Sequence, residues 1–426
     1  MNTALTEQDL AAVDVLLAGD DRRRQARYPG ESLTRQPVHT VYVPADRMTP
    51  TLPEQWGEAA AAALATHAAD AAGFATATGH GAADVEDVWA ALTRKLSEEP
   101  IEDLRIDLED GYGQRADDDE DEHAVAAGRA VQVAAERGVL PPYVGVRIKS
   151  LEAPTRRRGI RSLDLVLGAV LAGGQLPAGW IQTLPKVTST SQVTAMVEVC
   201  ARLERAHGLP EGRLRFEVQV ETPQAILGPD GTAMVARLIE AAAGRCSALH
   251  FGTYDYTAAL GIAGGYQAMD HPAADHAKAT MQVAAAETGV RLSDGSTNVL
   301  PVGDTRAVHA AWRLHAGLVR RSLERGFYQG WDLHPAQLPT RFLATFLFYR
   351  QDREAVGRRL AGYLRGAVGG VLDEPATARA LASFLLRGIH CGALTAEEVL
   401  GLAGTDVEGL IVLAGRPGLD GTMGAR

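Results

Sequence analysis

Short apolar runs rich in β-branched residues alternate with longer, alanine-rich amphipathic stretches between about residues 39 and 335. This alternation is typical of parallel βα units, in which each buried strand is followed by a covering helix. Eight strand-like runs can be counted, the seventh being the weakest: 39–46, 104–110, 143–150, 180–187, 215–222, 248–256, 291–301 and 327–335. Eight such repeats predict closure into an α/β fold of the TIM type, a (β/α)₈ barrel.

The segments between these runs carry a helical pattern. Apolar residues recur at helical spacing over 54–77, 123–137, 190–207 and 306–324, and glycine or proline lies near many of the ends. The alternative architecture is an open, doubly wound sheet. No GxGxxG turn follows the first strand, which weakens a dinucleotide-binding version of that alternative.

Three parts are expected along the chain. Residues 1–36 form a predicted N-terminal helical arm, residues 37–350 the barrel as catalytic domain, and residues 351–426 a C-terminal helical extension without strand signal. The acidic run 117–122 follows the second strand and would repel itself if it were packed. We therefore expect a solvated loop or a helix N-terminus there.

Composition narrows the classes of partner. With 42 basic and 53 acidic residues the formal net charge is −11, which argues against a nucleic-acid ligand. Cys200, Cys246 and Cys391 lack the spacing of a disulfide framework or a cysteine metal site. The sequence shows neither a signal-peptide pattern nor an apolar stretch that could span a membrane. We therefore expect a cytoplasmic protein without membrane contact.

Charged side chains cluster at the carboxyl ends of the predicted strands, where barrel enzymes place their chemistry. They are Asp107, Glu109, Asp110, Arg147, Lys149, Lys186, Glu221, Asp255, Asp332 and His334. Because unpaired buried charges are costly, acids in such number are expected to hold a cation or to pair with arginine and lysine. His334 is either a general base or a satisfied structural residue.

The acids at this rim favour one kind of metal. Carboxylate oxygens without paired histidine or cysteine suit Mg²⁺, with Mn²⁺ possible, better than Zn²⁺. Two protein carboxylates would leave the remaining positions to water and substrate, which is how a Mg²⁺ site chelates a 2-oxo acid.

Lysine usage leaves a second mechanism open. The chain has only four lysines, and two of them, Lys149 and Lys186, lie on predicted strands. Either could serve a structural ion pair or form a Schiff base, as in metal-independent aldolases.

Six motifs in this order carry a family resemblance. They are VPADR from Val43, IDLEDG from Ile106, VRIKS from Val146, LPKV from Leu184, VETPQA from Val220 and FGTYDYTAALG from Phe251. With these motifs the chain resembles the superfamily of the citrate lyase beta subunit, malyl-CoA lyase and hydroxy-acid aldolases, which are pyruvate- and phosphoenolpyruvate-binding TIM barrels. It resembles a divergent member.

The resemblance implies roles for residues of these motifs. It places the metal on Glu221 and Asp255, and it gives Arg147 the task of gripping a substrate carboxylate and steadying an enolate. Asp107, Glu109 and Asp110 resemble acids that hold the metal's waters and the arginine.

Further residues are expected to contact the substrate by the same resemblance. They are Lys149, Lys186, Gly252 and Thr253. Lys149, where many relatives have asparagine, would add positive charge for an anionic substrate, or it would pair with Glu109.

The leading functional prediction is a Mg²⁺-dependent carbon–carbon lyase or aldolase that acts on a 2-oxo acid, a hydroxy acid or an acyl-CoA thioester through an enolate. The alternatives are a Schiff-base aldolase, phosphoryl transfer of the phosphoenolpyruvate type, and a non-catalytic oxo-acid-binding protein. The resemblance also implies a homo-oligomer in which the C-terminal extension packs on a neighbouring subunit.

Overall fold

Eight parallel strands form the centre of the computed structural model, which describes residues 4–366 and 374–415. They are β1 (His39–Pro44), β2 (Asp103–Asp107), β3 (Tyr143–Arg147), β4 (Trp180–Leu184), β5 (Phe216–Val220), β6 (Cys246–Phe251), β7 (Arg291–Ser293) and β8 (Gly330–Asp332). Sheet neighbours follow chain order, and β8 pairs with β1. A bridge between Ser293 and Gln329 brings β7 to β8. The predicted (β/α)₈ barrel is confirmed.

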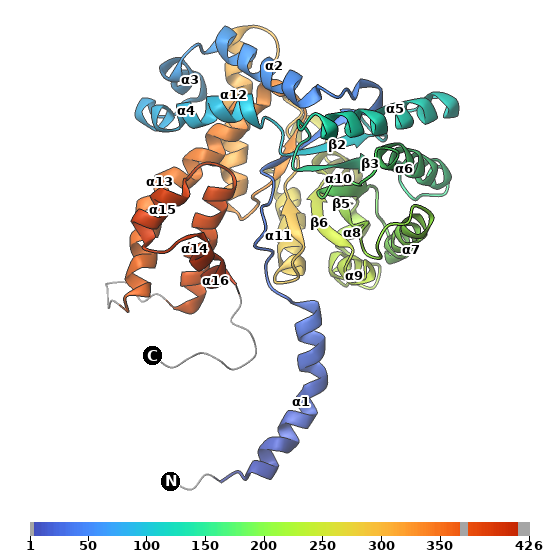
Figure 1. The fold of residues 1–426 in the computed structure, drawn as a ribbon, viewed down its shortest axis with the longest axis vertical. Coiled ribbons are helices and arrows are strands. Elements are labelled where there is room, and N and C mark those ends of the chain that lie inside the picture. Colours follow the sequence, from blue (N-terminus) through green and yellow to red (C-terminus); the bar gives the residue numbers. More distant parts are fainter. Residues whose placement is uncertain (1–3, 367–373, 416–426) are drawn as a thin grey trace.

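Helices wrap the barrel on its outside (Figure 1). The longer ones are α2 (Leu52–His67), α3 (Ala71–Thr78), α4 (Ala82–Glu98), α5 (Asp117–Glu136), α6 (Arg156–Leu171), α7 (Thr190–Ala206), α9 (Met234–Ala241), α11 (Pro272–Ala285) and α12 (Thr305–Glu324). The short helices α8 (Pro223–Ile226) and α10 (Thr253–Ala259) directly follow β5 and β6. They shape the carboxyl end of the barrel.

The structure refines two of the expected helices. The segment 54–77 is interrupted, because the Asp70 side chain accepts the Gly73 amide at 2.7 Å and starts a new helix there. The acidic run 117–122 opens α5, as one of the two predictions had it. Glu120 within that run is nevertheless buried and pairs with Lys149 and Arg158, so the run is only partly solvated.

Both ends of the chain are helical. Helix α1 (Glu7–Arg27) leads away from the barrel and buries none of its residues (Figure 1). The predicted boundary at residue 350 falls inside α13 (Leu338–Leu364), which packs on α4 and α12 of the same chain. The extension continues with α14 (Pro375–His390), α15 (Ala396–Ala403) and α16 (Val407–Ala414). Residues 1–3 of the predicted arm, and 367–373 and 416–426 of the predicted extension, lie outside the described residues. Among the helices described, none combines the length and apolarity that a membrane span requires.

Ionised side chains cross the interior of the barrel at mid-height. Arg105 on β2 donates to Glu217 on β5, at 3.1 and 2.8 Å, and to Thr183 on β4 at 3.1 Å. These strands are not all neighbours, so the contacts must run through the lumen. Nε2 of His250 on β6 lies 3.1 Å from Glu217. Burial alone would raise the pKa of Glu217, but Arg105 and His250 outweigh it and hold that pKa well below its usual range.

Asp332 does not belong to the charged rim on which the sequence placed it. It sits next to Trp331, whose indole donates to His250 inside the barrel, so Asp332 points outward. There it accepts Nε and Nη2 of Arg341 on α13, at 3.0 and 2.9 Å, and contacts His39 and His315 at 2.8 and 3.1 Å. The prediction that strand eight adds a charge to the rim is wrong for Asp332, which fastens helices to the barrel wall.

We expect Asp332→Asn to lower the free energy of unfolding by about 3–5 kcal/mol, because it leaves a buried arginine without its countercharge. Asp352→Asn, on the exposed part of α13, is the matched control and should change stability little. Urea unfolding followed by circular dichroism measures both. Equal stability of the two variants would contradict the assignment of Asp332.

Candidate active site

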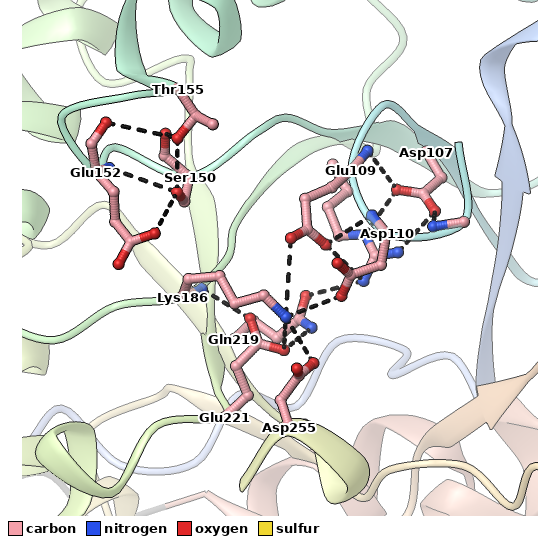
Figure 2. Close-up of polar contacts among 12 residues, drawn as sticks. Asp107, Glu109, Asp110, Ser150, Glu152, Thr155, Lys186, Gln219, Glu221 and Asp255 are labelled. Carbon is pink, nitrogen blue, oxygen red and sulfur yellow. Dashed lines mark hydrogen bonds and ion pairs between the residues drawn. The ribbon is translucent and has the colours of Figure 1, made fainter. Parts of the chain in front are cut away.

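The loop after β2 presents two acids at the carboxyl end of the barrel. The buried carboxylate of Asp107 accepts the amide of Glu109 at 2.9 Å and the amide of Gly111 at 2.8 Å. These bonds fold the loop so that Glu109 and Asp110 face Lys186, Glu221 and Asp255 (Figure 2). Asp107 therefore shapes the loop that carries its two acidic neighbours.

Arg147, the last residue of β3, is held by the same aspartate. Its Nε donates to Oδ1 of Asp107 at 2.8 Å and its Nη2 to Oδ2 at 2.6 Å, a bidentate pair. Nη1 lies 3.5 Å from Oε2 of Glu109 and 3.5 Å from Oε1 of Gln219. The guanidinium stacks over the ring of Tyr42 at 4.6 Å. The result is a fixed, nearly buried cation beside the acids.

The ammonium of Lys186 lies among four carboxylates (Figure 2). Its Nζ is 2.6 Å from Asp255, 2.8 Å from Asp110, 3.4 Å from Glu221 and 3.8 Å from Glu109. Oxygens of Asp110, Glu221 and Asp255 lie within 4.8 Å of one another. The Glu221 side chain is fully buried, whereas 54% of Asp110 and 49% of Asp255 are exposed, so the cluster opens to solvent on one side.

Three neighbours fix the Glu221 carboxylate. The backbone amide of Lys186 donates to Oε1 at 2.7 Å, from a residue with the left-handed φ of 51°. Nε2 of Gln219 donates to Oε2 at 2.5 Å. A Cβ at Gly252 would lie 2.5 Å from the Glu221 Cβ and 2.9 Å from Oε2, so only glycine allows this close approach.

The electrostatic surroundings raise the pKa of two acids of the site, Glu109 and Glu221, and of its lysine, Lys186. Burial raises the pKa of Glu221 to about 8 against the pull of Lys186, with Glu109 and Asp255 adding to the rise. Burial likewise raises the pKa of Glu109 to about 7, against Arg147 and Lys186. Burial alone would lower the pKa of Lys186, but the surrounding carboxylates outweigh this effect and raise that pKa. Lys186 is therefore a protonated cation.

The structure brings most of the predicted site residues together. Glu109, Lys186, Glu221 and Asp255 form one cluster, and Asp107 joins Arg147 to it. Gly252 lies against Glu221, and the buried hydroxyl of Thr253, the next residue, has no hydrogen-bond partner within the described part of the chain.

Lys149 is not brought to this cluster. Its ammonium donates to the carbonyl of Leu108 at 2.7 Å and pairs with Glu120 at 2.8 Å. The expected alternative, an ion pair with Glu109, is wrong in its partner. Lys149 ties the loop after β2 to α5.

The sequence did not predict the positions of three further residues of the site, Asp110, Gln219 and Tyr42. Asp110 was grouped with Asp107 and Glu109, yet it shares the cluster with Glu221 and Asp255. Gln219 stands two residues before Glu221 on β5, so the period-two rule for strands could have found it. Tyr42 carries no sequence signal. His334 caps the short helix η3 (Pro335–Gln337) by accepting the Ala336 amide at 3.1 Å, in agreement with its structural interpretation.

Several solved structures are similar to this chain. A citrate lyase from Burkholderia xenovorans LB400 is 20% identical, has a TM-score of 0.57, and is matched over 88% of this chain and 99% of its own. The protein CitE from Mycobacterium tuberculosis, in complex with magnesium, acetoacetate and coenzyme A, is 19% identical and has a TM-score of 0.48. It is matched over 85% of this chain and 100% of its own. A malate synthase from Haloferax volcanii, in a magnesium and glyoxylate complex, is 15% identical and has a TM-score of 0.47. It is matched over 90% of this chain and 98% of its own. The first of these shows a common barrel fold.

The chain is thus a (β/α)₈ barrel that shares its fold with this citrate lyase and carries a carboxylate cluster at its carboxyl end. It belongs to the family described as Domain of unknown function (DUF6986), which matches residues 17–416. None of the curated proteins matches this chain.

The raised pKa values predict a pH dependence of stability. The folded protein keeps protons on Glu109 and Glu221 that the unfolded chain releases near their ordinary value of 4.5. Their contribution to stability is present below that pH and is lost as the pH rises through about 7 and about 8. In metal-free buffer, we expect Glu221→Gln to flatten the fall in melting temperature between pH 5 and 9.

Glu324→Gln, an exposed position on α12, is the control and should follow the wild-type profile. Scanning fluorimetry with EDTA at each pH measures the three profiles. If Glu221→Gln falls in parallel with the wild type, the Glu221 carboxyl does not titrate as its burial requires.

Proposed function

We propose that this protein is a divalent-metal-dependent carbon–carbon lyase or aldolase that acts on a 2-oxo acid, a hydroxy acid or an acyl-CoA thioester through an enolate. The observation that carries the proposal is the gathering of Asp110, Glu221 and Asp255 within 4.8 Å of one another at the carboxyl end of the barrel. Enzymes with this fold have their active sites at this end of the barrel. The citrate lyase that shares the fold agrees with the lyase class.

The donor set fits a hard divalent cation. Glu221 and Asp255, joined by Asp110, would hold Mg²⁺, or Mn²⁺ as second choice, because all three offer carboxylate oxygens. When bound, such an ion supplies positive charge that polarises a carbonyl and favours its enolate. Lys186 contacts the same carboxylates, so its ammonium competes with any cation that enters the cluster.

Arg147 would bind the substrate's carboxylate and steady the charge of the enolate. Its guanidinium is permanently charged, is held in place by Asp107 and Tyr42, and lies 3.5 Å from Glu109 at the edge of the cluster. The buried hydroxyl of Thr253 has no hydrogen-bond partner within residues 4–366 and 374–415. These groups suit a small anionic substrate.

Glu109 is the best-placed group for proton transfer. Its pKa of about 7 lets it exist in both forms near neutral pH, as a general acid–base group requires. It lies between Arg147 and Lys186, the two cations of the site. Asp107, by contrast, is fully occupied by Arg147 and two amides, which makes it a positioning residue.

The Schiff-base alternative is less well supported by the geometry. A nucleophilic amine must lose its proton, whereas the carboxylates around Lys186 raise its pKa. Lys149 is held by Glu120 and the Leu108 carbonyl on the side of α5. Neither lysine has the apolar surroundings that favour a neutral amine.

Metal binding is the direct test. By calorimetry on EDTA-treated, dialysed protein, we expect one Mg²⁺ or Mn²⁺ site, lost in Glu221→Gln and in Asp255→Asn because each removes a charged ligand. Asp230→Asn, an exposed aspartate on another loop, should bind as the wild type does.

Gly252→Ala should weaken metal binding by about tenfold or more, since its methyl group displaces Glu221. Gly264→Ala, whose methyl group would meet nothing within 4 Å, is the matched control. A wild-type protein that binds neither ion sinks the proposal.

Turnover is tested with a panel of 2-oxo acids, hydroxy acids and acyl-CoA thioesters, with and without Mg²⁺. We expect cleavage or condensation that needs the metal, and a kcat lowered by about 10²–10³ in Arg147→Lys, because lysine cannot reproduce the fork of charged donors. Arg161→Lys, at an exposed position of α6, controls for the substitution. Borohydride trapping with pyruvate should leave Lys149 and Lys186 unmodified in a mass map. A trapped adduct at either lysine would favour the Schiff-base mechanism.

A further inference from the structure

A second cleft lies at the opposite end of the barrel from the carboxylate cluster. It has a volume of about 380 Å³ and is lined by Gln36, Arg291, Tyr328, Arg379 and Arg387, among others. Gln36 precedes β1, Arg291 begins β7 and Tyr328 precedes β8, so this cleft is at the amino ends of the strands. Arg379 and Arg387 reach it from α14. We call it the basal cleft.

The basal cleft concentrates positive charge without matching negative charge. Of its lining arginines, Arg291, Arg379 and Arg387 form no ion pair with any carboxylate of residues 4–366 and 374–415. The Nε of Arg379 is buried and has no hydrogen-bond partner in the same part of the chain. Glu31 is an acid in the lining, and it accepts the Glu287 amide at 3.4 Å. Among the lining residues that the structure describes, three guanidinium groups therefore face one acid.

The arginines are held in place by their surroundings. The guanidinium of Arg387 stacks over the ring of Tyr328 at 4.2 Å. Arg291 donates to the carbonyl of Thr34 at 3.0 Å and to its hydroxyl at 2.5 Å. Two elements far apart in the sequence, β7 and α14, thus present fixed cations to one space.

A neighbouring histidine reports the same charge. His390 lies on α14 in a smaller cavity that shares Tyr328 and Arg387 with the basal cleft. Burial lowers the pKa of His390, and Arg35, Arg291 and Arg387 lower it further. Arg35 is neutralised by Glu99 and Glu102, which leaves the two arginines of the cleft as the uncompensated source.

We propose that the basal cleft is a second binding site, for a small molecule that carries a phosphate or carboxylate group. Half-buried guanidinium groups without a countercharge are costly, and an oxyanion that accepts their paired N–H groups removes this cost. The volume suits a metabolite-sized ligand. Because Arg291 belongs to the barrel while Arg379 and Arg387 belong to the extension, the ligand joins these two parts of the chain. The site is independent of the carboxylate cluster and of the function proposed for it.

The test is binding of inorganic phosphate, pyrophosphate and citrate to the metal-free full-length protein, by calorimetry at constant ionic strength set with NaCl. We expect saturable binding of at least one probe, together with a rise in melting temperature. The double variant Arg379→Ala/Arg387→Ala should bind it about tenfold or more weakly. Phosphate as the better probe identifies a phosphate ligand, and citrate as the better probe a carboxylate ligand.

Two controls separate this cleft from other sites. Arg202→Ala removes an exposed arginine on α7 and should bind as the wild type does. Glu221→Gln should also leave binding unchanged, since it changes the other end of the barrel. Arg387→Lys serves if the double variant fails to fold, and it should weaken binding while keeping the charge.

The proposal is overturned if none of the three probes saturates above the chloride background, or if the arginine variants bind as the wild type does. It is equally overturned if light scattering shows that the double variant alters the oligomeric state while no probe binds. In that case the cleft is a contact between protein chains. A failure of Mg²⁺ binding at Glu221 would leave this inference untouched.

Discussion

The constraint on which this structure depends is charge compensation inside a closed barrel. Strand β2 turns Asp103, Arg105 and Asp107 inward, because side chains alternate along a strand. Strand β5 likewise turns Glu217 and Gln219 inward, and Glu221, the residue directly after β5, continues this alternation. At mid-height Arg105 pairs with Asp103 and Glu217, and Glu217 also contacts His250, so each of these groups has a partner within the barrel. At the carboxyl end the acids outnumber the cations more strongly. There Asp107, Glu109, Asp110, Glu221 and Asp255 face two cations, Arg147 and Lys186. The excess of acid is what makes this end suited to a divalent cation.

The fold and the core of the site were predictable because both follow from local pattern. Short apolar runs between amphipathic stretches define βα repeats, and the carboxyl ends of parallel strands must meet. Glu221 and Asp255 were therefore expected to meet Lys186 although 69 positions separate Lys186 from Asp255, and the structure joins them at 2.6 Å. The position of Asp332 could also have been found, because its neighbour Trp331 faces inward and adjacent strand residues point to opposite faces.

Other features could not be predicted because they depend on partners distant in sequence. Lys149 and Lys186 both follow strands and look alike in sequence. β3 ends at Arg147, and beyond it the chain carries Lys149 to Glu120, an acid inside a run that looked solvated. Lys186 instead has a left-handed backbone, which sequence pattern does not reveal outside glycine. The gap that Gly252 leaves for Glu221 is likewise visible only in three dimensions.

Lys186 shows how one residue can hold the cluster by two separate means. Its amide fixes one oxygen of Glu221 at 2.7 Å, while its ammonium lies 3.4 Å from the other oxygen and bridges Asp110 to Asp255. A positive φ in a residue other than glycine costs about 1–3 kcal/mol and persists only where the surroundings impose it. Here the surroundings are the carboxylates themselves, since releasing the backbone would withdraw both contacts from Glu221. The strained conformation and the raised pKa of Glu221 thus have one origin: a buried acid for which the chain provides a shared, partial countercharge.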